Sequence, residues 1–454
     1  MAYFFGCERE PNHPAMKRTI PSLVTVLLFI TLNASAQPAA STTRVFTTDI
    51  DNFWVAYDSV QTTTDSLQQL HFIQTLYVDK GTPGLKAFMQ VRGYSAPQWV
   101  GVLRSYPKFW RSIRPDIIAM KSHAGEIEVY VQKFKRLYPP LTDAKIYFTV
   151  GCLNSGGTTL DSLILIGTEI AAGNPATDVS EFPNKWLAGV FQSLKTADIV
   201  PLNIHEYVHT QQKKTMQANL LGEALKEGSA DFIAELVMGS PMQSNHIVYG
   251  KEHEAELKQQ FAAEMFSHST SQRWLYSGTR FRTIPDLGYF MGYSICAAYY
   301  QQAQNKQQAI RDIIKLNYGD TAATENFLRN SGYYTSFPDK AASFVAIQNH
   351  IPAQTGSLPF ANGDMTVDPG LQAISLQFSQ PLVDGWYEIH ADKESKDSFP
   401  AIIKKELSTD KRTLMLHLTL SPGQSYTLVT EFLSPEGYYG KSQLHFKTRE
   451  GGAF

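Results

Sequence analysis

The pentapeptide His205-Glu206-Tyr207-Val208-His209 constrains the fold of this chain more than any other segment. Residues four apart lie on one face of an α-helix, so a helix here would direct both imidazoles toward one point. Apolar residues precede the pentapeptide over 199–204, and polar residues follow it over 211–214. This pattern is typical of a helix that is buried at its start and reaches the surface at its end. The pattern therefore predicts a helix with two metal-ligand candidates. A surface helix with two incidental histidines is the alternative.

A second helix is predicted over 218–238, with Gly239 as its stop. It carries Glu227, which offers a carboxylate oxygen eighteen residues beyond His209. A catalytic zinc ion takes three protein ligands and keeps one position open for water. His205, His209 and Glu227 supply such a set, and we expect one Zn²⁺ per chain.

Two further carboxylates fit the chemistry of such a site. Bound zinc lowers the pKa of a water molecule toward neutrality, and Glu206 suits the role of the general base that takes the water proton. Asp231 follows Glu227 by one helical turn and is expected to accept the free ring N–H of a ligand histidine.

An acidic stripe on the second helix gives a competing interpretation, because such stripes are usually solvated. Its members are Glu223, Glu227, Asp231 and Glu235. Apolar residues over 230–237 indicate instead that the helix is largely buried, and buried carboxylates need a partner such as a metal ion. Glu223 lies on the same face as Glu227 and competes with it as the third ligand. The histidines at 246, 253 and 268 are expected at the surface.

The chain as a whole is too long for a single ordinary core, because 454 residues indicate two or three domains. Its net charge of −2 gives no electrostatic reason to expect nucleic acid or an anionic membrane surface as a partner.

The amino terminus has the three parts of a secretory signal peptide. Lys17-Arg18 precedes an apolar run over 20–32, and Ala34-Ser35-Ala36 follows it. We expect a signal peptide over 1–36 with its true start at Met16. The run is too short for a membrane span. The protein is therefore expected in the periplasm, in the cell envelope or outside the cell.

Three cysteines are present, and Cys7 lies in the part that export would remove. An oxidising compartment would permit Cys152 and Cys296 to pair, but two buried free thiols are an equally good interpretation.

The expected metallopeptidase domain spans 37–350, with a helical part over 45–140 and a catalytic core over 141–335. Two β-like runs, 146–150 and 163–170, come shortly before the histidine helix, with a turn over 154–158 between them. An exposed edge strand can hold an extended peptide by main-chain hydrogen bonds. Gly167, Thr168 and Glu169 are therefore candidate substrate-binding residues, although an ordinary hairpin is the alternative.

The carboxy-terminal part changes character. Gly, Pro, Asn and Asp mark a linker over 351–369, and short runs with a period of two follow over 370–454. Alternating runs separated by turns such as Ser421-Pro422-Gly423 predict a small β-sandwich.

The motifs resemble those of known families. A His-Glu-x-x-His helix followed by Glu227 and Asp231 is similar to the gluzincin zinc peptidases, the group of thermolysin and aminopeptidase N. Much of 45–335 also resembles uncharacterised bacterial proteins described as predicted zinc-dependent proteases. These resemblances imply an α+β fold: a mostly helical, gluzincin-like catalytic domain with a small β-sheet. Residues 376–382 and 420–426 resemble a bacterial Ig-like domain, which implies a spacer or an adhesion module that contacts a surface or a glycan.

The same resemblance implies a group that stabilises the developing oxyanion. The segment Tyr289-Phe290-Met291-Gly292-Tyr293 is similar to the catalytic tyrosine segment of the aminopeptidase relatives, with Tyr289 at the tyrosine position and Met291 in place of a lysine. Tyr293 is the alternative.

Together these features predict an exported zinc metallopeptidase that acts on a peptide or protein substrate. A non-catalytic envelope or surface binding protein on the same fold is one alternative. A zinc hydrolase of non-peptide amides or esters is another.

Overall fold

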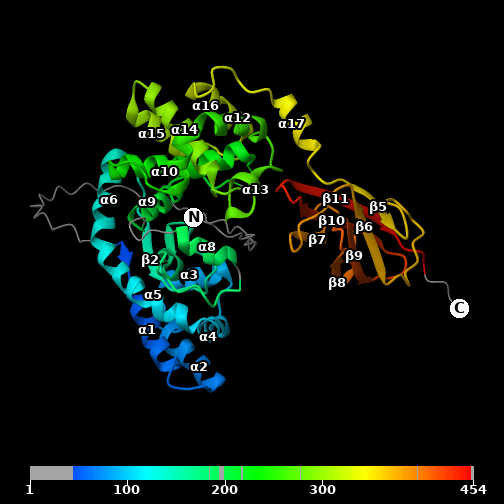
Figure 1. Ribbon diagram of the computed structural model, residues 1–454, viewed down its shortest axis with the longest axis horizontal. Helices are drawn as coiled ribbons and strands as arrows, with labels where there is room; N and C mark the ends of the chain where they lie inside the picture. Colours follow the sequence, from blue (N-terminus) through cyan, green and yellow to red (C-terminus); the bar gives the residue numbers. More distant parts are fainter. Residues whose placement is uncertain are drawn as a thin grey trace, which may run out of the picture.

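The computed structural model describes residues 44–183, 185–193, 199–215, 218–276, 278–395 and 397–450. A helix-rich part comes first and a strand-rich part follows (Figure 1). Each part has its own hydrophobic cluster, one reaching from Val45 to Leu328 and the other from Phe360 to Phe446. The predicted order of a helical part and then a strand-rich part is confirmed. The expected signal peptide over 1–36 lies outside the described residues.

The amino-terminal part is helical, as predicted. Its helices are α1 (Thr48–Val60), α2 (Ser66–Ile73), the π-helix η1 (Gln74–Val78), α3 (Pro83–Arg92), α4 (Ala96–Ser105), α5 (Pro107–Ala119), the 3₁₀-helix η2 (Met120–His123) and α6 (Ala124–Leu137). Local sequence sets several of their starts. The Asp65 side chain accepts from two backbone N–H groups at the start of α2, and Thr82 caps α3 directly before Pro83.

A small sheet lies between these helices and the histidine helix. It consists of β1 (Val45–Phe46), β2 (Lys145–Thr149), β3 (Gly157–Leu160) and β4 (Leu163–Gly167) in the order β1-β2-β4-β3. Strands β1, β2 and β4 are parallel, and β3 is antiparallel to β4 at the edge. The sequence missed β3, which begins inside the expected turn. Thr158, Thr159 and Leu160 favour a strand, and Asp161, at φ 53°, reverses the chain into β4.

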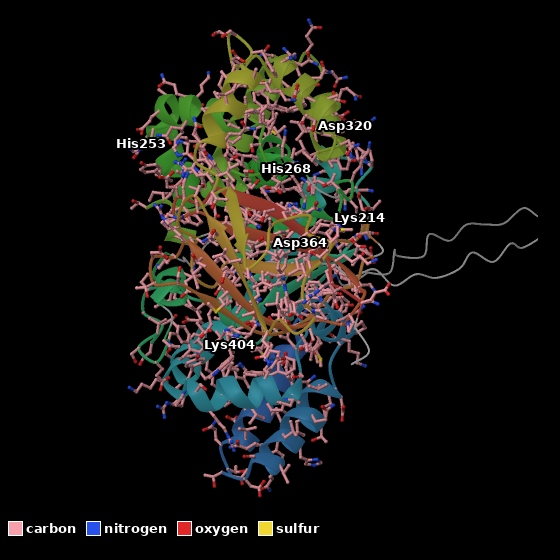
Figure 2. The ribbon with its side chains drawn as sticks, turned by 90° about the vertical axis from the view of Figure 1, so that its right-hand side faces the viewer. Lys214, His253, His268, Asp320, Asp364 and Lys404 are labelled. Atoms are coloured by element: carbon pink, nitrogen blue, oxygen red, sulfur yellow. The ribbon has the colours of Figure 1, made fainter. Side chains whose placement is uncertain are left out.

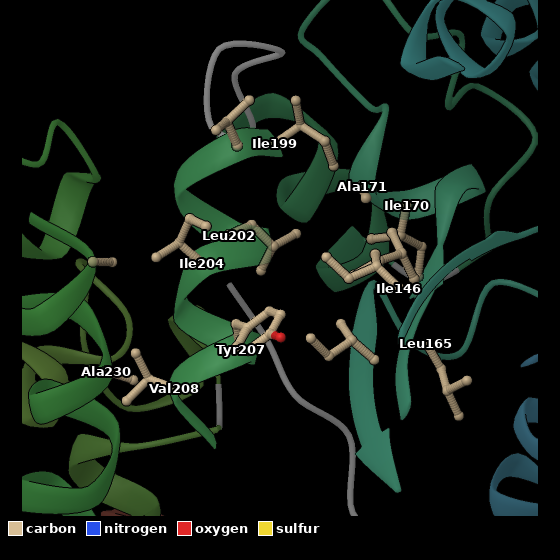
Figure 3. Packing of buried hydrophobic residues seen from close by; sticks show 14 of the residues in the cluster. Ile146, Leu165, Ile170, Ala171, Ile199, Leu202, Ile204, Tyr207, Val208 and Ala230 are labelled. Atoms are coloured by element: carbon tan, nitrogen blue, oxygen red, sulfur yellow. The ribbon is translucent and has the colours of Figure 1, made fainter. Parts of the chain in front are cut away.

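The histidine helix α9 (Ile199–His209) follows α7 (Thr168–Ala171) and α8 (Lys185–Ser193), and it packs between the sheet and α10 (Leu220–Met238). Its apolar side chains point both ways: Leu202 and Tyr207 toward the sheet, Ile204 and Val208 toward Ala230 of α10 (Figure 3). The Asn219 side chain caps α10, and Gly239 ends it in the left-handed conformation. The predicted helix and its end at 238 are confirmed, and its start lies at Leu220 instead of 218.

The remaining helices complete the helix-rich part. They are α11 (Asn245–Glu252), α12 (Glu254–Glu264), α13 (Ser271–Trp274), the 3₁₀-helix η4 (Gly278–Arg280), α14 (Leu287–Gln302), α15 (Lys306–Lys315), α16 (Thr321–Ser331) and α17 (Lys340–Gln348).

Two glycines let α10 and α14 approach backbone to backbone. A Cβ at Gly292 would lie 1.7 Å from the Ala224 carbonyl oxygen, and one at Gly228 would lie 2.1 Å from the Tyr293 nitrogen. No side chain fits at either position without separating the helices. Because α10 carries Glu227, this contact fixes where that carboxylate lies.

The strand-rich part holds two sheets. One has the order β5-β6-β9-β8 and the other the order β11-β10-β7. Their strands are β5 (Gln354–Leu358), β6 (Ala373–Phe378), β7 (Tyr387–Ala391), β8 (Ala401–Leu407), β9 (Thr413–Thr419), β10 (Ser425–Leu433) and β11 (Tyr439–Lys447). One hydrophobic cluster joins both sheets. An Ig-like sandwich, and contact of this part with a surface or a glycan, stay predictions.

The expected linker over 351–369 is wrong in its extent. Strand β5 lies inside it and pairs with β6, and Phe360 and Val367 join the core of the strand-rich part. Its Gly, Pro and Asn content reflects turns within a folded unit, which composition alone does not distinguish from a linker.

Cys152 and Cys296 are both buried and free. None of the helices in the described part of the chain has the length and apolar character that crossing a bilayer requires.

The close contact of α10 and α14 can be tested by adding a single methyl group. We expect Gly292→Ala to lower the free energy of unfolding by about 1–3 kcal/mol, because the methyl group meets the Ala224 backbone. Gly101→Ala is the matched control, since Gly101 is exposed on α4 with nothing near its Cβ, and it should stabilise the protein by about 0.5–1 kcal/mol. Urea denaturation measures both. Equal effects would contradict the packing described.

Candidate metal centre

Three predicted side chains meet between α9 and α10. His205 Nε2 lies 3.0 Å from His209 Nε2, and Glu227 Oε2 lies 3.1 Å from His209 Nε2 and 3.6 Å from His205 Nε2. The helical spacing of four places the two imidazoles side by side, and α10 brings the carboxylate to both. Among the described residues, these three form the only such group that could hold a metal ion.

The spacing of these atoms fits a tetrahedral metal ion. Ligand atoms about 2.0–2.2 Å from such an ion lie about 3.3 Å from one another, and the three observed separations bracket that value. Two neutral imidazole nitrogens and one carboxylate oxygen are suitable ligands for a divalent transition metal. Three protein ligands leave a fourth position for water or substrate.

Asp231 holds His205 in place. Its Oδ1 lies 2.7 Å from His205 Nδ1, and its Oδ2 lies 2.8 Å from His246 Nε2. With a proton on Nδ1, His205 donates to Asp231 and keeps Nε2 for a metal ion. The sequence placed His246 at the surface, but its side chain is only 11% exposed. It comes from α11, and no local pattern signals that its side chain reaches Asp231 on α10.

His209 is held by a residue that the sequence did not identify. Its Nδ1 lies 2.8 Å from Gln212 Oε1, and Gln212 Nε2 donates to Ser229 Oγ and to the Lys226 carbonyl, both at 2.9 Å. Gln212 thus connects the end of α9 to α10. A polar residue three positions after the second histidine is the signal that could have found it.

Tyr276 is the second residue missed at the site. Its hydroxyl donates to Glu227 Oε1 at 3.1 Å, so that Oε2 faces the histidines. Tyr276 has φ 63°, a left-handed backbone that is uncommon for tyrosine. It lies 49 residues from Glu227 in sequence, in an irregular segment, and nothing in its neighbourhood in the sequence marks it.

The buried charges of the site set each other's pKa values. Burial by itself raises the pKa of Glu227, but the two histidines hold it well below its usual range. Burial lowers the pKa of His205, and the charge and hydrogen bond of Asp231, with the Glu227 carboxylate 3.6 Å away, outweigh burial and raise it to about 10. Without a metal ion, His205 is therefore protonated at neutral pH.

Glu206 is buried on α9 beside the edge strand β3. A Cβ built at Gly157, the first residue of β3, would lie 3.1 Å from Glu206 Oε1. Glycine at this position lets the carboxylate lie close to the strand. The candidate base thus adjoins the ligand candidate His205 and lies close to the strand at the sheet edge.

The two tyrosines predicted from the sequence, Tyr289 and Tyr293, make different contacts. The Tyr289 ring packs against His205, with centroids 6.0 Å apart, and the residue is 3% exposed. The Tyr293 hydroxyl donates to Glu235 Oε1 at 2.6 Å, and Glu235 lies two helical turns beyond Glu227. Their catalytic roles stay predictions.

Gly167, Thr168 and Glu169 lie at the end of β4 and the start of α7, and all three are buried. The Glu169 carboxylate accepts from the backbone N–H groups of Gly151 and Leu153, at 2.7 and 3.1 Å. Burial raises its pKa to about 7, although these hydrogen bonds oppose the rise. These residues support the loop that precedes β3, and β3 itself forms the edge.

Glu223, the competing ligand, does not join the ligand group. Burial raises its pKa to about 7, and the charge of Glu227 adds to the rise. The other two histidines expected at the surface lie apart from the ligand group. Both are labelled in Figure 2. His268 is exposed, and the ring of His253 stacks on that of Tyr249.

Residues 104–284 match the family model of gliding motility protein GldB, which describes lipoproteins. The match includes the ligand group and Tyr276. It is consistent with a location in the cell envelope, as the amino-terminal sequence predicts. No curated protein matches the chain.

The expected membership of the gluzincin peptidases is wrong, because the family model that matches this region is that of GldB and no peptidase family matches. A five-residue motif with one downstream glutamate is too short to determine a family. The match ends at residue 284, so the Ig-like resemblance of the carboxy-terminal part stays a prediction.

Three similarities to solved structures are weak. CopC from Methylosinus trichosporium OB3b is 14% identical over 23% of this chain and 99% of its own, with a TM-score of 0.19. PcoC, a methionine-rich copper resistance protein from Escherichia coli, is 16% identical over 22% and 98%, also at 0.19. The bacterial S-layer protein SbsC is 14% identical over 61% of this chain and 43% of its own, at 0.18. Scores this low carry no conclusion about fold or function.

The protonation of His205 gives metal affinity a defined pH dependence. A metal ion binds the neutral imidazole, so it must displace the proton that His205 holds below its pKa of about 10. We expect zinc affinity to rise about tenfold per pH unit between pH 6 and 8. Competition with a chelator at several pH values measures this. An affinity that is flat over this range would contradict the charge arrangement.

Proposed function

We propose that this protein is an exported zinc-dependent hydrolase that cleaves peptide bonds, with Glu206 as its general base. The convergence of His205 Nε2, His209 Nε2 and Glu227 Oε2 at 3.0–3.6 Å carries the proposal. Two imidazoles and a carboxylate are a ligand set of catalytic zinc, and the open fourth position distinguishes such a site from a structural one.

Glu206 supports a hydrolytic role in particular. A bound zinc ion would acidify a water molecule and polarise the carbonyl under attack. The charge of Glu206 is among the causes that raise the pKa of His205, which supports a place for its carboxylate near the ligand group. Glu206 would accept the proton of that water and later deliver it to the leaving amine. Asp231 and Gln212 would keep both imidazoles in the tautomer that presents Nε2.

The edge strand β3 supports peptides as the substrate class. It ends the sheet order β1-β2-β4-β3, and Gly157 places it next to Glu206. An extended peptide that adds to such an edge by main-chain hydrogen bonds would run past the candidate base. The reaction would take place in the periplasm, in the envelope or outside the cell, as the amino-terminal sequence and the lipoprotein family match suggest.

A second candidate function follows from the GldB match, since that family is named for gliding motility. In this case the chain would be a non-catalytic part of the envelope. The metal ion would join α9 to α10 without supporting hydrolysis.

One substitution distinguishes the two candidates. We expect Glu206→Gln to bind zinc as the wild type does and to lower kcat on a peptide library by roughly 10²–10⁴. Metal analysis and library cleavage measure these effects. Stoichiometric zinc without cleavage by the wild type would favour the envelope role, and a wild type without zinc would contradict both roles for the metal.

Gly157 tests the placement of Glu206 against β3. A valine here would press on Glu206 Oε1, because even its Cβ would lie 3.1 Å from that atom. We expect Gly157→Val to lower kcat at least tenfold while zinc affinity stays unchanged, since the ligands themselves do not move. Thr159→Val, also in β3, is the control and should cleave normally. Equal activity of both variants would argue against β3 as part of the site.

A further inference from the structure

We propose that the turn between β10 and β11 in the strand-rich part sets the orientation of Glu227 through the segment that carries Tyr276. We call residues 269–276 and 278–286 the Tyr276 segment. The inference rests on the proposed metal site, and it gives the carboxy-terminal part a role in that site.

Tyr276 determines which oxygen of Glu227 faces the histidines. Its hydroxyl donates to Oε1 at 3.1 Å, and Oε2 then lies 3.1 Å from His209 Nε2. A carboxylate with neither oxygen held can rotate about its last bond. The tyrosine therefore acts as a positioning residue for a ligand, a task that hydrogen-bond partners of metal ligands commonly perform.

The backbone conformation of Tyr276 depends on contacts with its surroundings. Its φ of 63° and that of Asp286, 59°, are both in the left-handed region, which side chains other than glycine adopt only when their surroundings require it. The Tyr276 N–H donates to Asp286 Oδ1 at 2.9 Å, and Leu275 packs against Gly288 of α14. The segment needs further contacts to keep this geometry.

Arg273 and Glu264 supply the first of those contacts. Arg273 Nε and Trp274 Nε1 both donate to Glu264 Oε2 on α12, at 3.0 and 2.8 Å. Arg282 lies over the Trp274 ring at 3.9 Å and donates to the Arg273 carbonyl at 2.9 Å. Arg273 is thus attached to α12 by one edge of its guanidinium.

The other edge of Arg273 reaches the turn between β10 and β11. Its Nη1 donates to the Glu436 carbonyl at 2.5 Å, and its guanidinium lies 4.4 Å from the centre of the Tyr438 ring. Such charged contacts are stronger than neutral hydrogen bonds. Arg273 therefore bridges the two parts of the chain three residues before Tyr276.

Two backbone contacts close the same interface. The Tyr439 N–H donates to the Ser269 carbonyl at 2.7 Å, and a Cβ at Gly437 would lie 2.8 Å from the Phe281 ring. In Figure 1, α13 lies on the side of the helix-rich part that faces the strand-rich part. The turn thus contacts the Tyr276 segment before and after Tyr276.

A double-mutant cycle on zinc affinity tests the inference. Tyr276→Phe and Tyr438→Ala are made in the full chain, singly and together, and zinc binding is measured by competition with a chelator. We expect Tyr276→Phe to weaken zinc binding about tenfold and Tyr438→Ala to weaken it by no more than that. The double variant should bind zinc like Tyr276→Phe, because both changes act on the same carboxylate.

Ile403→Ala is the control within the strand-rich part. Ile403 is 75% exposed on β8, away from the turn, and its variant should bind zinc like the wild type. Thermal melting shows whether Tyr438→Ala keeps its fold. If it does not, Arg273→Lys replaces it, because lysine keeps the charge beside Glu264 but lacks the second N–H edge that reaches Glu436.

The outcomes separate this inference from the proposed hydrolase. The inference would be overturned if the losses of zinc affinity in the two single variants added up in the double variant, or if a folded Tyr438→Ala bound zinc as tightly as the wild type. Neither result would affect the proposed hydrolase if the wild type still cleaves peptides. A wild type that binds zinc but cleaves no peptide would contradict the proposed hydrolase function. The effect of Tyr438 and Tyr276 on zinc affinity could still be measured. A wild type that binds no zinc would overturn both.

Discussion

The site depends on three polar side chains that are buried together. An isolated buried carboxylate or imidazolium loses its hydration without compensation, at a cost of several kcal/mol. Between α9 and α10, His205, His209 and Glu227 compensate one another. Each needs the others within 3.0–3.6 Å, so the relative position of the two helices has little freedom. A metal ion at their centre would bind the same three atoms and compensate for their lost hydration.

Several separate contacts in the rest of the helix-rich part hold these three side chains in place. Gly228 and Gly292 have no side chain, so α10 can lie directly against α14, and this contact fixes the helix that carries Glu227. Asp231 and Gln212 each hold the outer nitrogen of one histidine. Tyr276 holds the outer oxygen of Glu227, and its segment contacts the strand-rich part. Every ligand candidate thus has its own partner, each from a different position in the chain.

The sequence predicts those features that depend on local spacing. His205 and His209 are four positions apart, as are Glu227 and Asp231, and this spacing is enough to place each pair on one helix face. Gly239 marks the end of α10 for the same local reason. His246 and Tyr276 reach the site only through packing of distant elements, and the left-handed φ of Tyr276 has no sequence signal of its own. Strand β3 was missed because its three strand-forming residues lie between turns. The family resemblance failed because local spacing does not determine the fold around it.

X-ray absorption at the zinc edge of the metal-loaded chain tests the central claim most directly. Two imidazole nitrogens and light oxygen ligands at about 2.0–2.2 Å are expected, with four ligands in total. Replacing Glu227 by alanine should change the oxygen shell and leave both imidazoles in place. Sulfur scattering at about 2.3 Å, or a spectrum without imidazole, would contradict the assignment of His205, His209 and Glu227 as the ligands.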